Sequence, residues 1–130
     1  MTTNEAPLSL GGRRFDSARQ QERDSAAREA NMILITGTVD VAEVNRAAFI
    51  AAASHHVTRS REEAGCISHG FFEDVMAPGT FVFVERWRDM KAVQAHFAMD
   101  YSREIVGVIR GLSERSTGVE IHEVASTRVV

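Results

Sequence analysis

A carboxylate, an indole and an imidazole lie close together in the stretch Phe81–His96 (FVFVERWRDMKAVQAH). Glu85 and Trp87 are two apart in a strand-like run, so their side chains share one face of that strand. His96 follows after a turn and a short helix and could return to the same face. An imidazole titrates near neutral pH, and together with a carboxylate it can take a proton from a phenol.

These residues can be given roles in one pocket. We expect His96 to be the base or hydrogen-bond donor and Glu85 to orient it. Trp87, Phe83 and Phe97 are predicted to form apolar walls against a planar substrate. The alternative stays open that Trp87 is a core residue, that Glu85 pairs with an arginine, and that His96 is a satisfied core histidine.

Other residues with chemical potential give weaker signals. His69 on a second predicted strand and Tyr101 at a helix junction are candidates for lining the pocket. His55 and His56 are adjacent on a predicted helix, point about 100° apart, and chelate one ion poorly. The sequence has neither H-x-x-x-H nor C-x-x-C spacing and no glycine-rich nucleotide motif. It therefore predicts no metal site and no bound cofactor.

The bulk properties favour one globular domain. The chain has 130 residues, 44% of them hydrophobic, and a net charge of −3, which argues against a nucleic-acid surface. No apolar run approaches the roughly 20 residues of a membrane helix, and residues 6–10 are too short for a signal-peptide core. The single cysteine, Cys66, is predicted to be a small buried side chain and fits a reducing cytoplasm.

The periods of apolar residues predict the elements that position the site. Strands are expected at Met32–Val39, Cys66–Asp74, Phe81–Trp87 and Val119–Ala125. Helices are predicted to begin at caps on Asp40, Asp89 and Ser102. The first helix is expected to bury one stripe, made of Val44, Ala47, Ala48, Ala51 and His55. Residues 1–31 are rich in charged residues and are predicted to form a flexible or partly helical arm.

This order of elements predicts an α+β domain over residues 32–126. Its pattern is the ferredoxin-like split βαβ, a four-stranded antiparallel sheet with helices on one face. Val82 and Val84 alternate with Phe81 and Phe83, so the second sheet face is also apolar. Because such a face is commonly a partner surface, we expect a homodimer in which two sheets stack.

The domain resembles the antibiotic biosynthesis monooxygenase family from Met32 to about Ala125. The resemblance depends on the E-x-G-C motif and strand of Glu62–Asp74 (EEAGCISHGFFED), the E-x-W strand of Phe81–Trp87, and Ala95 with His96 in the next helix. It implies a dimeric α+β barrel with one pocket between helices and sheet in each subunit.

The resemblance also implies an activity. The best-known members of the family oxidise phenolic or quinol-like polyketide intermediates with molecular oxygen and without a bound cofactor, so the resemblance implies an electron-rich aromatic substrate. Haem-degrading relatives use an asparagine on the first strand and a histidine on the last helix, and neither is present here. The other candidate function is a non-catalytic homodimer of the same fold, either ligand-binding or purely structural.

Overall fold

The computed structural model describes residue 19 and residues 31–130. The elements follow in the order β1 (Ile33–Val41), α2 (Glu43–Ser60), β2 (Cys66–Glu73), β3 (Thr80–Trp87), α3 (Met90–Phe97), α4 (Asp100–Leu112) and β4 (Ser113–Glu123). The strands form one antiparallel sheet in the order β2-β3-β1-β4. The predicted α+β, ferredoxin-like architecture is therefore confirmed. Apart from residues 19 and 31, the predicted arm 1–31 lies outside the described residues.

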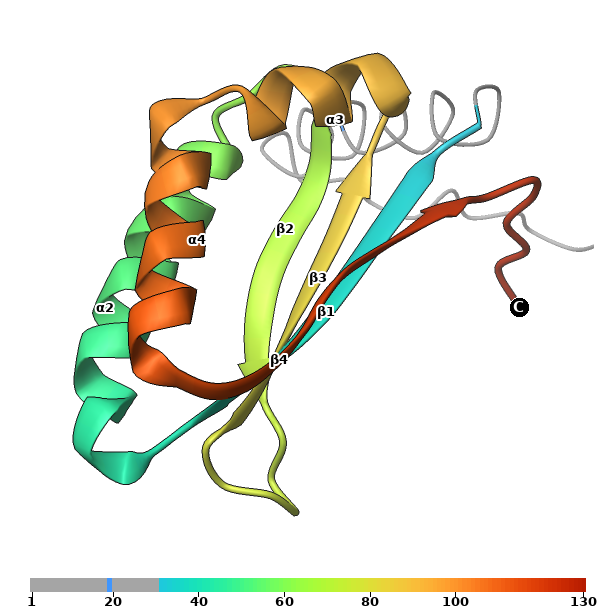
Figure 1. The fold of residues 1–130 in the computed structure, drawn as a ribbon. Helices are drawn as coiled ribbons and strands as arrows, with labels where there is room; N and C mark the ends of the chain where they lie inside the picture. Colours follow the sequence, from blue (N-terminus) through green and yellow to red (C-terminus); the bar gives the residue numbers. More distant parts are fainter. Residues whose placement is uncertain (1–18, 20–30) are drawn as a thin grey trace, which may run out of the picture.

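The helices cover one face of the sheet. Figure 1 shows α2 and α4 side by side along that face, with α3 across one end. Every second side chain of β3, from Phe81 to Trp87, is buried beneath them. Phe49 of α2 is fully buried and packs on Phe81 with 4.8 Å between ring centroids. Within the described part of the chain, no helix is long and apolar enough to cross a membrane.

The buried face of α2 differs from the predicted one. The expected stripe from Val44 to His55 is exposed, and Val44 itself is 88% exposed. The helix instead buries a stripe made of Phe49, Ala53, His56, Val57 and Ser60. Alanine fits either face of a helix, whereas Phe49 has the largest apolar side chain and sets the face that turns inward.

Two of the three predicted helix caps are wrong. Asp89 does cap α3, since its carboxylate accepts the Ala92 N–H at 2.8 Å. Asp40 instead remains in β1, where it accepts a hydrogen bond from the Thr80 hydroxyl. Ser102 lies inside the first turn of α4, which begins at Asp100. β4 also begins much earlier than the predicted Val119, directly after α4.

Candidate functional site

Strand β3 brings the predicted acid and indole together. Glu85 and Trp87 point to the helix-covered face, where their exposed fractions are 5% and 0%. The indole N–H of Trp87 donates to Glu85 Oε1 at 2.9 Å. The shared face that was predicted from their spacing is therefore confirmed, and a buried carboxylate stands at its centre.

Helix α3 returns His96 to this pair. Its ring lies against the Trp87 indole, with ring centroids 4.4 Å apart and planes tilted by 33°. His96 Nε2 is 3.8 Å from Glu85 Oε1, and the histidine is only 2% exposed. The predicted constellation of acid, indole and imidazole thus exists in the folded chain.

Glu63, in the loop before β2, is the carboxylate nearest to His96. Its Oε2 lies 2.7 Å from His96 Nδ1 and accepts the Tyr101 hydroxyl at 2.5 Å. The loop reaches α3 because it has no side chain at Gly65, where a Cβ would lie 2.3 Å from that of Ala92. The role of Glu63 was missed from the sequence, although it lies in the E-x-G-C region.

Two further histidines complete a buried group around His96. One ring nitrogen from each of His56, His69 and His96 lies within 4.8 Å of the other two, and these three could hold a metal ion. His56 comes from α2, and its Nδ1 is 3.2 Å from the Tyr101 carbonyl oxygen. It was missed because sequence reasoning considered it only as a neighbour of His55.

The surroundings shift the pKa values of three groups. Burial, followed by the charges of His69 and His96, lowers the pKa of His56 to about 4, so His56 is neutral at pH 7. Burial raises the pKa of Glu85, but neighbouring His69 and the Trp87 N–H outweigh it, and the net pKa is lowered. Burial and the hydrogen bond to Glu63 raise the pKa of Tyr101. Glu85 therefore stays an anion, and Tyr101 stays a hydrogen-bond donor.

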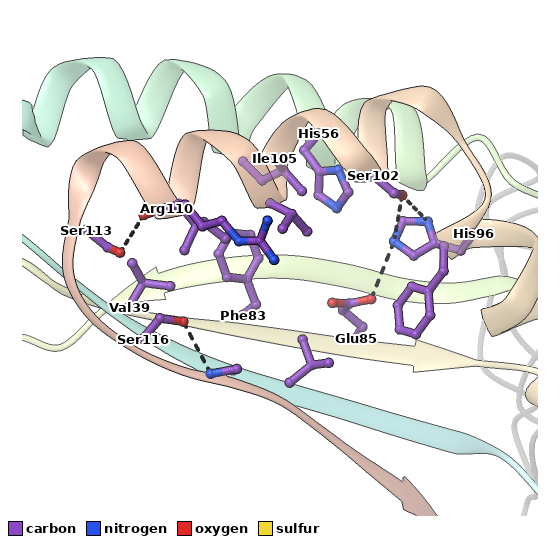
Figure 2. Close-up of a pocket in the computed structure, with 16 residues that line it drawn as sticks. Val39, His56, Phe83, Glu85, His96, Ser102, Ile105, Arg110, Ser113 and Ser116 are labelled. Carbon is purple, nitrogen blue, oxygen red and sulfur yellow. Dashed lines mark hydrogen bonds and ion pairs between the residues drawn. The ribbon is translucent and has the colours of Figure 1, made fainter.

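A cavity of about 550 Å³ adjoins this group between the sheet and α4. This volume falls in the usual range for small-molecule sites. Figure 2 shows Glu85, His56, His96 and Ser102 at one end of the cavity and Ser113 and Ser116 at the other, while the Arg110 side chain reaches from α4 toward the middle. The walls between the two ends are largely apolar and include Val39, Phe83, Ile105, Val106, Ile109 and Val119.

The predicted site residues fall into two groups around the cavity. Glu85, His96, Phe83 and Phe97 line it. The other three, Trp87, His69 and Tyr101, are absent from its lining. Ligand contact by these three residues stays a prediction. In the structure the Trp87 indole N–H donates to Glu85, His69 Nε2 lies 3.2 Å from Glu85 Oε1, and the Tyr101 hydroxyl donates to Glu63.

Comparisons with known proteins agree with the fold. The sequence profile described as antibiotic biosynthesis monooxygenase matches residues 32–108. An uncharacterised protein of Synechocystis is 32% identical over 98 residues, which are 75% of this chain and 67% of that protein. YcnE of Bacillus subtilis, provisionally named a monooxygenase, is 34% identical over 65 residues, 50% of this chain and 68% of YcnE.

Solved structures show the same architecture. A Bacteroides thetaiotaomicron protein of unknown function is 32% identical, with a TM-score of 0.67 over 72% of this chain and 99% of that one. A Deinococcus radiodurans structure, assigned provisionally as an antibiotic biosynthesis monooxygenase, has a TM-score of 0.71 at 20% identity. It covers 75% of this chain and 97% of that chain, and at this identity it supports the fold alone.

Proposed function

Because the chain belongs to the antibiotic biosynthesis monooxygenase family, we propose that it is a monooxygenase acting on an electron-rich aromatic such as a phenol or quinol. Molecular oxygen is the oxidant, and the substrate itself supplies the electrons. The observation that carries the proposal is the pair of Glu63 and His96, joined at 2.7 Å, beside a largely apolar cavity that His96 lines.

The pair supplies a base with a defined tautomer. Glu63 accepts the Nδ1–H of His96, which leaves the lone pair on Nε2 to accept a proton from a phenol. Ser102 Oγ lies 3.4 Å from each ring nitrogen of His96 and can orient the substrate oxygen. Tyr101 donates to the same Glu63 oxygen and fixes the carboxylate.

The cavity walls favour the oxidation that follows. Largely apolar walls offer a phenolate little solvation, so the anion keeps its electrons more available than it would in water. It transfers them to oxygen, and one oxygen atom enters the product while the other leaves as water. Phe83 and Phe97 provide flat apolar surface for the aromatic ring.

Oxygen consumption tests this function. The purified chain is incubated with a panel of hydroquinones and anthrones, with ¹⁸O₂ to trace incorporation. On a working substrate, His96→Gln should lower the rate by about 10²- to 10⁴-fold, the usual contribution of a general base. His55→Gln is the matched control, since His55 is exposed on α2. An unchanged rate in a folded His96→Gln chain would contradict the assignment.

The second candidate function is a non-catalytic, ligand-binding dimer, because the cavity is large enough to hold a small molecule without any reaction. Binding of panel compounds without oxygen uptake would favour it.

In either case we propose a homodimer through the uncovered sheet face, where Val82 and Val84 are half-buried and Phe72 is 61% exposed. A cytoplasmic location is also proposed, from the single, buried Cys66.

A further inference from the structure

We infer that His56, His69 and His96 form a binding site for one divalent transition-metal ion, with an open coordination position toward the cavity. The three side chains come from α2, β2 and α3 and are at most 5% exposed. One ring nitrogen of each lies within 4.8 Å of the other two. Because His56 and His96 also line the cavity, an ion between the rings would be reached from there.

The spacing is close to that of a metal-bound group. Zinc–imidazole bonds of about 2.0–2.1 Å place tetrahedral ligand nitrogens about 3.3 Å apart. Starting from separations of at most 4.8 Å, each nitrogen would move inward by about 0.8 Å or less.

Two of the rings are already held as metal ligands are held. A ligating histidine usually donates its second ring N–H to a carbonyl or a carboxylate. His56 Nδ1 lies 3.2 Å from the Tyr101 carbonyl oxygen, and His96 Nδ1 lies 2.7 Å from Glu63 Oε2. These contacts favour tautomers that leave each Nε2 lone pair available to an ion.

The third ring supplies an independent reason for a ligand. Both nitrogens of His69 are buried, and neither has a hydrogen-bond partner among the described residues. Its Nε2 lies 3.2 Å from Glu85 Oε1, close enough for charge attraction but without the direction of a hydrogen bond. Buried polar atoms without a partner are rare, and a bound ion would satisfy one of them.

The ligand set indicates which ions fit. Imidazoles suit zinc, copper, iron and nickel, whereas magnesium and calcium prefer oxygen ligands. The anionic Glu85 beside His69 would offset part of the ion's charge. Three histidines with one open position are also the arrangement of catalytic rather than structural zinc sites.

This inference goes beyond the proposed function and does not depend on it. An ion bound at His96 Nε2 occupies the lone pair that the base would use. The metal-bound chain and the proton-accepting chain are therefore two separate states of one site. Metal binding is measured without substrate, so a failure of either proposal is visible without reference to the other.

The test uses the full-length, tag-free chain after removal of metals with a chelator. Co²⁺ is titrated while visible absorbance is recorded, and Zn²⁺ is titrated by calorimetry. We expect one ion per chain and cobalt bands typical of imidazole coordination. His69→Gln should weaken binding by about 100-fold or more, since it removes a ligand. His55→Gln, on the exposed side of α2, should bind like the wild type.

Equal binding by the wild type and a folded His69→Gln chain would overturn the inference. A second measurement covers the case in which this variant does not fold. Zn²⁺ should raise the unfolding temperature of the wild type and of His55→Gln in a concentration-dependent way, because it binds the folded state. No rise at millimolar Zn²⁺ would equally overturn the site.

Discussion

Replacing Glu63 by glutamine should both destabilise the fold and change the tautomer of His96. The Glu63 side chain is only 11% exposed, and one of its oxygens receives two hydrogen bonds, from His96 and Tyr101. Glutamine keeps the shape of the side chain but removes its charge. Its amide can also donate to His96 Nδ1, which would move the proton of the imidazole to Nε2.

The magnitude follows from these two bonds. A hydrogen bond to a charged group contributes about 1.5–3 kcal/mol, and a neutral one about 0.5–1.5 kcal/mol. Losing the charge of Glu63 therefore costs about 1 kcal/mol for each bond, or about 2 kcal/mol in the free energy of unfolding. The rate on a working substrate should fall by about 10²-fold or more, because the base has the wrong tautomer.

Urea unfolding measures the stability, and ¹⁵N NMR of the imidazoles identifies the tautomer without substrate. Glu62→Gln is the matched control, since Glu62 is next in the chain and its exposed carboxylate contacts Arg59 at 3.8 Å. Its change in stability should stay below about 1 kcal/mol. Equal effects of the two substitutions, together with an unchanged His96 tautomer, would refute the reasoning.

Three further predictions concern other parts of the molecule. Tyr101 is the single tyrosine, and burial together with the hydrogen bond to Glu63 raises its pKa. In a pH titration, the phenolate absorbance of the folded chain should therefore appear at a pH well above the midpoint near 10 that is expected for the denatured chain. The stability that this hydrogen bond contributes should be complete below about pH 10 and lost as the pH rises through the raised folded pKa. A folded midpoint near 10 would contradict the contact. The hydrogen bond from Arg46 and then the Gly79 N–H lower the pKa of Glu73 from 4.5 to about 2. The stability from this carboxylate should be complete above pH 4.5 and lost toward pH 2, and acid unfolding of Glu73→Gln should show a smaller pH slope over that window; the same slope in both chains would rule this out. Val84→Arg, on the uncovered sheet face, should convert the proposed dimer to a monomer in analytical sedimentation. Val44→Arg, on the exposed side of α2, should leave the dimer intact. A wild-type chain that sediments as a monomer would count against the dimer.

The local periods of the sequence determined much of the scaffold. The period of two along β3 placed Glu85 and Trp87 on one face, because a strand alternates its side chains whatever surrounds it. The cap at Asp89 was equally local, since a carboxylate reaches the N–H of Ala92 within one helical turn. The order of the elements then indicated the ferredoxin-like sheet.

Tertiary packing decided which residues meet. His56, Glu63 and His69 lie on α2, a loop and β2, and no spacing within the sequence relates them to His96. The inward face of α2 was also decided by packing, because alanine-rich stripes are ambiguous until a large side chain such as Phe49 finds the core. The sequence by itself thus determined a fold and the pair on β3. Only the folded chain brought three imidazoles and two carboxylates together, because their contacts join segments that are distant along the chain.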